Sequence, residues 1–136
     1  MASEAAPSLF QGIDTLALVR SLQTGGQKVQ EVCELVLQGT GIAEPKLKAF
    51  TSIEPKLVLE TAQALDMFRL SGRPVGPLHG LPVVLSDLIQ TQQQPTTNGT
   101  KLDTAKQGSK DSAVAERLKA SGSVLLGKTT ISELGV

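Results

Sequence analysis

The sequence contains no tryptophan and no tyrosine, and only three of its 136 residues are phenylalanine. So few aromatic rings argue against a surface that stacks nucleic-acid bases. Neither positive nor negative charge is in excess, because 13 lysines and arginines balance 13 aspartates and glutamates. That balance gives no electrostatic reason to expect a nucleic acid or an anionic membrane as a partner. We therefore expect no nucleic-acid partner and no membrane partner.

Cysteine is also scarce, since Cys33 is the only one. A single cysteine excludes an internal disulfide and cannot build a cysteine-rich metal site. It lies in VQEVCELVL, a helical pattern in which a small buried residue is the expected role. A catalytic thiol would need basic neighbours, whereas the nearby charges are Glu31 and Glu34. We expect neither a metal site nor a cofactor.

Long apolar runs are absent as well. No stretch approaches the roughly 20 apolar residues that span a membrane. The first residues, MASEAAPSLF, lack the basic segment and apolar segment of a signal peptide. These two absences favour a soluble, cytoplasmic protein. An apolar content of 40% over 136 residues still allows one globular domain with its own core.

Residues 1–75 read as mainly helical and residues 76–136 as strand–loop–helix–strand. In the first part we expect helices over 15–23, 29–37 and 55–70 and a short strand over 49–53. Asp14 is the expected N-cap of the first helix, and glycines 39 and 41 are expected to stop the second. Pro55 suits the first turn of the third helix.

The second part is organised around GPLHGLPVVLSDLIQT, residues 76–91. Its apolar run Leu81–Leu85 has the length and β-branched content of a buried strand, and Pro82 is tolerated at a strand's start. Ser86 and Asp87 then lie where the strand ends. In α/β sheets the strand ends are the usual place for chemistry.

A second strand is expected over 123–126, after a helix, VAERLKASG, that Asp111 or Ser112 caps. Thr129 or Thr130 is expected to cap one more helix. This order predicts an α/β fold in which the helical N-terminal half packs on a mixed or parallel sheet. Adjacent buried strands should then hold Val83, Val84, Val124, Leu125 and Leu126, with Val114 and Leu118 covering them.

Residues 122–129, GSVLLGKT, match the pattern of a phosphate-binding loop. That loop follows a strand and exposes its amides between the glycines. Here a helix precedes Gly122, and residues 124–126 are apolar strand residues. We therefore interpret the segment as a helix-stop glycine, a buried strand and a glycine turn, and we expect no nucleotide binding.

Three segments, GPLHGLPVVLSD, PTTNGT and DSAVAERLKASGSVLLGKTTISE, together resemble the N-terminal part of the amidase signature family. The resemblance is clearest from Gly76 to Glu133. It implies that residues 1–136 are the N-terminal portion of one domain. Members of that family hydrolyse or transfer carboxamides with a serine, a second serine on a cis peptide, and a lysine.

The resemblance assigns Ser86 to the family's catalytic-lysine position. A serine hydroxyl is too weakly basic and too short to act as that base, so Ser86 is not expected to function catalytically. The Gly/Ser-rich loop that carries the family's two serines lies beyond Val136. Five further residues are implied to be structural and near the site: His79, Gly80, Asp87, Thr97 and Gly99. His79 is expected to be a turn histidine satisfied by backbone.

Two functions stay open. The first is an amidase of the Ser-Ser-Lys type acting on a small carboxamide, inactive as this chain stands. The second is a non-catalytic binding or regulatory module derived from the same fold. A piece of a larger α/β domain would leave sheet edge and apolar surface uncovered, and it should then self-associate.

Overall fold

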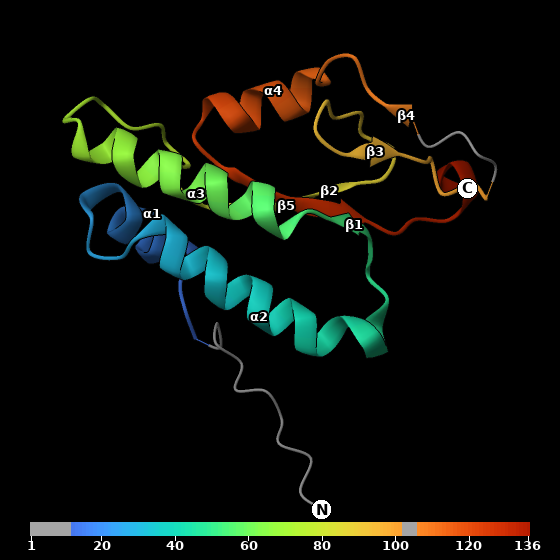
Figure 1. Cartoon of the computed structure of the whole chain (residues 1–136), viewed down its shortest axis with the longest axis horizontal. Helices are drawn as coiled ribbons and strands as arrows, with labels where there is room; N and C mark the ends of the chain where they lie inside the picture. Colours follow the sequence, from blue (N-terminus) through green and yellow to red (C-terminus); the bar gives the residue numbers. More distant parts are fainter. Residues whose placement is uncertain (1–11, 102–105) are drawn as a thin grey trace, which may run out of the picture.

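The computed structural model describes residues 12–101 and 106–136. Four α-helices and five strands are present in this part of the chain, followed by a 3₁₀ turn (Figure 1). In chain order the elements are α1 (Thr15–Thr24), α2 (Val29–Leu47), β1 (Phe50–Ile53), α3 (Pro55–Leu70), β2 (Pro82–Ser86), β3 (Pro95–Thr96), β4 (Lys106–Gln107), α4 (Ala113–Ala120), β5 (Val124–Thr129) and η1 (Glu133–Gly135).

A mixed three-stranded sheet has the order β1-β5-β2. β5 lies in the centre, parallel to β2 and antiparallel to β1. Figure 1 shows α2 on one side of β5 and α4, β3 and β4 on the other. The parallel pair β2–α4–β5 and the helical N-terminal half agree with the predicted α/β class, which is confirmed.

The apolar core joins the helices to the central strand. Its buried members come from α1, α2, α3 and β5: Leu18, Leu22, Val29, Val32, Cys33, Val58, Ala62, Val124 and Leu126. Burial raises the pKa of the Cys33 thiol to about 12, and Asp66 and Glu34 also act to raise it. Cys33 is therefore a buried core residue without thiolate character at neutral pH.

Helix ends follow the local sequence at most positions. Asp14 caps α1 through its carboxylate and Ser112 caps α4 through its hydroxyl, while Pro55 opens α3. α2 begins differently, because Lys28 occupies the N-cap position and makes no side-chain cap hydrogen bond. Instead the carboxylate of Asp66, on α3, accepts hydrogen bonds from the backbone amides of Val29 (2.9 Å) and Gln30 (3.0 Å).

The prediction that α2 stops at the glycines is wrong, since the helix continues to Leu47. A glycine costs only about 1 kcal/mol relative to alanine inside a helix, so packing of the preceding turns can carry the helix past it. Pro45 is tolerated in the last turn. The end is set by Lys48, whose backbone is left-handed (φ 49°) and whose amide bonds the Glu44 carbonyl.

Part of the predicted strand core is also wrong. β2 and β5 are adjacent, and Val124 and Leu126 are buried, but Val84 is 46% exposed and Val114 is 50% exposed. Val84 is exposed because it alternates with the buried Leu85 and therefore points to the opposite face of β2. β5 also runs on to Thr129, so no helix is capped there. A 3₁₀ turn follows at Glu133–Gly135 instead.

Candidate functional site

The carboxyl ends of the parallel strands β2 and β5 lie side by side. Leu85 pairs with Lys128 and Ser86 pairs with Thr129 in the register. Successive side chains of a strand point to opposite faces of the sheet. Leu85 and Lys128 therefore share one face, and Ser86 and Thr129 share the other. The sheet thus separates the lysine of this strand pair from the serine beside it.

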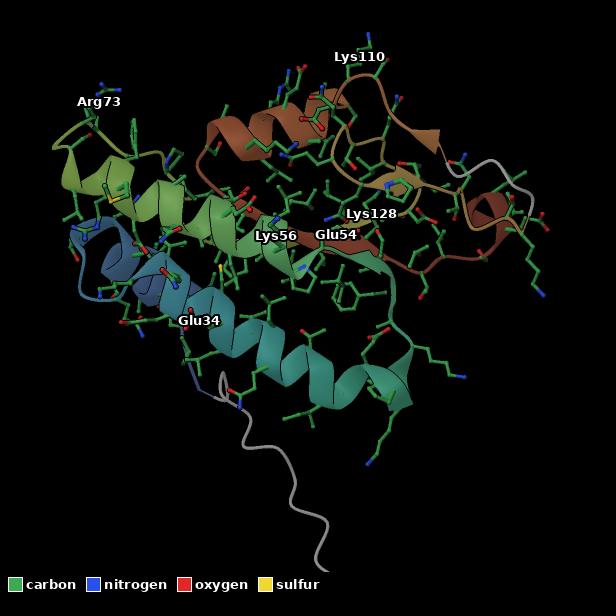
Figure 2. The ribbon with its side chains drawn as sticks, viewed as in Figure 1. Glu34, Glu54, Lys56, Arg73, Lys110 and Lys128 are labelled. Carbon is green, nitrogen blue, oxygen red and sulfur yellow. The ribbon has the colours of Figure 1, made fainter. Side chains whose placement is uncertain are left out.

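Lys128 is completely buried. Figure 2 shows it between β5 and β3, whereas Lys110 and Arg73 project at the edge of the molecule. Its Nζ donates a hydrogen bond to Thr96 Oγ1 (2.9 Å) and lies 4.0 Å from a carboxylate oxygen of Asp87. Thr96 Oγ1 in turn donates to the Ile89 carbonyl (3.4 Å). The hydroxyl is therefore an acceptor for the lysine and a donor to the backbone.

The electrostatic environment of Lys128 combines two opposing effects. Burial lowers the pKa of Lys128, because removing an ammonium from water disfavours its charged form, and the nearby Asp87 carboxylate acts in the opposite direction. Asp87 is itself fully buried. A buried charge is tolerated in a protein only when it is paired and hydrogen-bonded, and these two groups meet that condition together.

Asp87 also holds the segment that follows β3. One carboxylate oxygen accepts a hydrogen bond from the Thr97 amide (3.0 Å), and the other accepts one from the Thr97 hydroxyl. The Asp87 carbonyl accepts the Asn98 amide (3.2 Å). We call Asp87, Thr96, Thr97 and Lys128 the Lys128 cluster. Both threonine hydroxyls are used inside it, Thr96 Oγ1 by Lys128 and Thr97 Oγ1 by Asp87.

The turn after Thr97 is equally constrained. Asn98 and Gly99 both have positive φ angles, 55° and 71°. A Cβ atom on Gly99 would lie 2.6 Å from the Ser132 carbonyl oxygen, so only glycine fits this close approach. The Asn98 carbonyl accepts the Leu134 amide (2.8 Å). The turn therefore links the ends of β2 and β3 to the residues that follow β5.

Ser86, the residue at the predicted lysine position, is partly buried at the end of β2. Its Oγ accepts a long hydrogen bond from the Leu88 amide (3.4 Å), and its carbonyl accepts the Ile89 amide (2.9 Å). These bonds form a local turn. The residue beside Ser86 in the strand register is Thr129 rather than a lysine.

His79 and Gly80 lie at the other end of β2. His79 is 1% exposed, and among the residues that the structure describes its Nε2 finds no hydrogen-bond partner. Burial lowers its pKa, with Asp66 acting in the opposite direction and Arg69 in the same one. Gly80 has a φ of 75°, and its amide bonds the Gly122 carbonyl (2.8 Å). The Leu78 amide bonds the Ser121 carbonyl (2.9 Å), so Leu78 and Gly80 tie the turn to the Ser121–Gly122 segment, while the His79 amide bonds the Gly76 carbonyl (3.1 Å) within the turn.

Lys128 received no site role from the sequence, where it was considered only within the phosphate-loop pattern. The predicted strand ended at residue 126, and the expected glycine turn after it is wrong, because β5 continues through Gly127 and Lys128 to Thr129. Among residues 12–101 and 106–136 no group of three potential metal ligands is present. Within the same described ranges no helix has the length and apolar character needed to cross a bilayer.

Comparison with known proteins shows the family to which the chain belongs. The family model called Amidase matches residues 31–136. Curated relatives include a glutamyl-tRNA(Gln) amidotransferase subunit of Salinispora arenicola, 33% identical over 82% of this chain and 23% of its own length, and one of Chloroflexus aurantiacus, 34% identical over 85% and 24%. The chain belongs to the amidase family, and within it the resemblance to the amidase signature proteins is confirmed.

Solved structures give the same result for the fold. The peptide amidase of Stenotrophomonas maltophilia superposes with a TM-score of 0.83 at 30% identity, over 92% of this chain and 26% of that one. A structure described as an unexpected vestigial protein complex, bearing on the origins of an s-triazine catabolic enzyme, superposes with a TM-score of 0.83 at 29% identity, over 89% and 27%. The chain spans about a quarter of the length of the curated relatives it matches.

Proposed function

We propose that residues 1–136 form the N-terminal portion of an amidase-signature domain that lacks the family's base and hydrolyses no amide as it stands. One observation carries the proposal. Ser86 occupies the position that the family resemblance gives to the lysine, and its hydroxyl is used in a local turn with Leu88. A serine hydroxyl cannot accept a proton near neutral pH as a buried, neutral amine can.

Lys128 does not replace the missing base in this proposal. Register and strand alternation support this view, because they put its side chain on the opposite face of the sheet from Ser86. Its Nζ is also occupied by Thr96 and lies near Asp87 in a site closed to water. A substrate carbonyl would have no access to it.

The test is an amidase assay on aliphatic and aromatic carboxamides with the chain, Ser86→Lys and Ser86→Ala. We expect no turnover above buffer from any of them, because residues 1–136 contain no counterpart of the family's serine-bearing loop. Turnover by the unmodified chain or by Ser86→Ala would refute the proposal.

A complete relative supplies the positive arm of the experiment. In the peptide amidase of Stenotrophomonas maltophilia, the family resemblance leads us to expect the catalytic lysine at the position of Ser86. Replacing that residue by serine should lower kcat by about 10²–10⁴-fold, the range for loss of a general base. An unchanged kcat would show that a serine at this position is compatible with catalysis.

The second candidate is a non-catalytic module that binds a partner. What favours it is an apolar surface along the β2 edge: Val84 is 46%, Leu88 41% and Leu134 63% exposed. A Cβ on Gly135 would lie 3.0 Å from Leu88 Cδ1, so the ends of β2 and η1 are neighbours. Both curated relatives named above are subunits of an amidotransferase. Sedimentation of the purified chain separates the two candidates. A stable monomer at all concentrations would favour the self-contained module, whereas self-association would favour a piece of a larger domain with uncovered apolar surface.

A further inference from the structure

Lys128 donates a hydrogen bond to a residue of β3 rather than to its neighbours in the sheet. The acceptor, Thr96, is the last residue before the Thr97–Asn98–Gly99 turn. β3 has only two residues, and its partner strand, β4, is equally short. So short a ladder cannot fix the turn that follows, and other contacts must do so.

We propose that Lys128 is a positioning residue that holds the Thr96–Gly99 segment over the ends of β2 and β5 through the Thr96 hydroxyl. The proposal deepens the proposed function, because the segment held in this way lies beside position 86. Lys128 is suited to the task since a donor on the central strand is fixed by strands on both sides.

Contacts from several parts of the chain converge on this segment, and Lys128 supplies the one from β5. Asp87 binds the Thr97 amide and hydroxyl from the end of β2. The Leu134 amide binds the Asn98 carbonyl from the residues after β5. Without the lysine, Thr96 would keep its long bond to the Ile89 carbonyl, and Asp87 would lose its counter-charge.

Buried ion pairs often add little net stability, because desolvation of both charges offsets their attraction. A positioning role therefore predicts a local effect that exceeds the global one. Amide hydrogen exchange separates the two, since loops open locally while core amides report larger openings. The Thr97 and Asn98 amides report on the segment, and the Val124 amide, bonded to the Leu81 carbonyl, reports on the sheet.

The experiment measures exchange at these amides in the unmodified chain, Thr96→Val, Thr96→Ser and Lys128→Met. A hydrogen bond to a charged group corresponds to about tenfold or more in the opening equilibrium. We expect Thr96→Val to accelerate the Thr97 and Asn98 amides by about tenfold or more, with the Val124 amide changing by less than about twofold. Thr96→Ser keeps the hydroxyl and should restore slow exchange.

The double variant tests whether the effect runs through Lys128. In the Lys128→Met background, Thr96→Val should change loop exchange by less than about twofold, because the bond is already lost. Thr61→Val is the matched control, since its hydroxyl bonds to the Leu57 carbonyl within α3. It should leave the loop amides unchanged.

Three results would overturn the proposal. These are unchanged loop exchange in Thr96→Val, equal acceleration of the loop and Val124 amides, or a full Thr96→Val effect in the Lys128→Met background. If Lys128→Met does not fold, Thr96→Val and Thr96→Ser still test the proposal. It is contradicted if Thr96→Val does not accelerate exchange of the loop amides, or if Thr96→Ser fails to restore slow exchange. The measurement uses no substrate, so it can fail independently of the amidase assays.

Discussion

The core beneath the helices and the Asp87–Lys128 pair of the Lys128 cluster are both buried, but they are held by different chemistry. Leu22 and Val29 are fully buried in the core, and Asp87 and Lys128 are fully buried in the cluster. Apolar side chains pack without direction, so the core depends on volume. Buried charges depend on a particular partner at a particular place. Removing one side chain should therefore lower the free energy of unfolding more in the Lys128 cluster than in the core.

The largest effect should come from Lys128→Ala. Removing one partner of a buried pair leaves the other as an uncompensated charge, which costs about 3–5 kcal/mol. Urea denaturation measures this loss. Lys56→Ala is the control, since the Lys56 side chain is 90% exposed and its pair with Glu60 is a surface one. A loss no larger than that of the control would mean that the Asp87–Lys128 pair is not held in the folded state.

Leu22→Ala should come next. Leu22 is fully buried among helices α1, α2 and α3, so truncation leaves a cavity and costs about 2–5 kcal/mol. Leu47→Ala makes the same chemical change at a side chain that is 69% exposed and should stay within about 0.5 kcal/mol. Equal losses at the two leucines would contradict the core as described.

The smallest effect concerns His79, a buried polar residue outside both regions. Its folded-state pKa lies below the ordinary 6.5, so below 6.5 the unfolded chain binds more protons than the folded one. The contribution of His79 to the stability of the folded state is therefore fully present above pH 6.5. It is lost as the pH falls from 6.5 through the lower pKa that His79 has in the folded state.

His79→Asn should remove that pH dependence. The comparison is direct, because His79 is the only histidine. Denaturation midpoints recorded between about pH 5.5 and 7.5, the range in which histidine titrates, should fall as the pH is lowered in the unmodified chain and stay flatter in His79→Asn. Parallel slopes in the two proteins would show that His79 is accessible to protons in the folded state.

The two regions also differ in how far the sequence predicts them. Helical spacing and caps such as Asp14, Pro55 and Ser112 predicted where three helices begin. These signals are local, and the helical pattern around Cys33 likewise predicted that this residue is buried. The end of α2 was missed because a modest glycine penalty is outweighed by tertiary packing, which no local pattern contains.

The cluster could not be assembled in this way. Thr96 and Lys128 are 32 residues apart in the chain, and no periodicity connects them. A lysine is normally exposed, so its burial follows only from the strand that carries it and the segment that covers it. Ser86 was placed at the end of its strand by the same apolar run that defined the strand, and the family resemblance gave that position its meaning.

The cap that Asp66 of α3 provides for the first turn of α2 bears on the order in which the chain folds. Asp66 lies 37 residues after Val29, and its carboxylate binds the first two amides of α2. The first turn of a helix is the costly step in forming it, because several residues are fixed before any helical bond forms. α2 thus gains its starting contact only after α3 has formed and docked. In a kinetic hydrogen-exchange experiment we therefore expect the first-turn amides of α2 to become protected no earlier than the amides of α3.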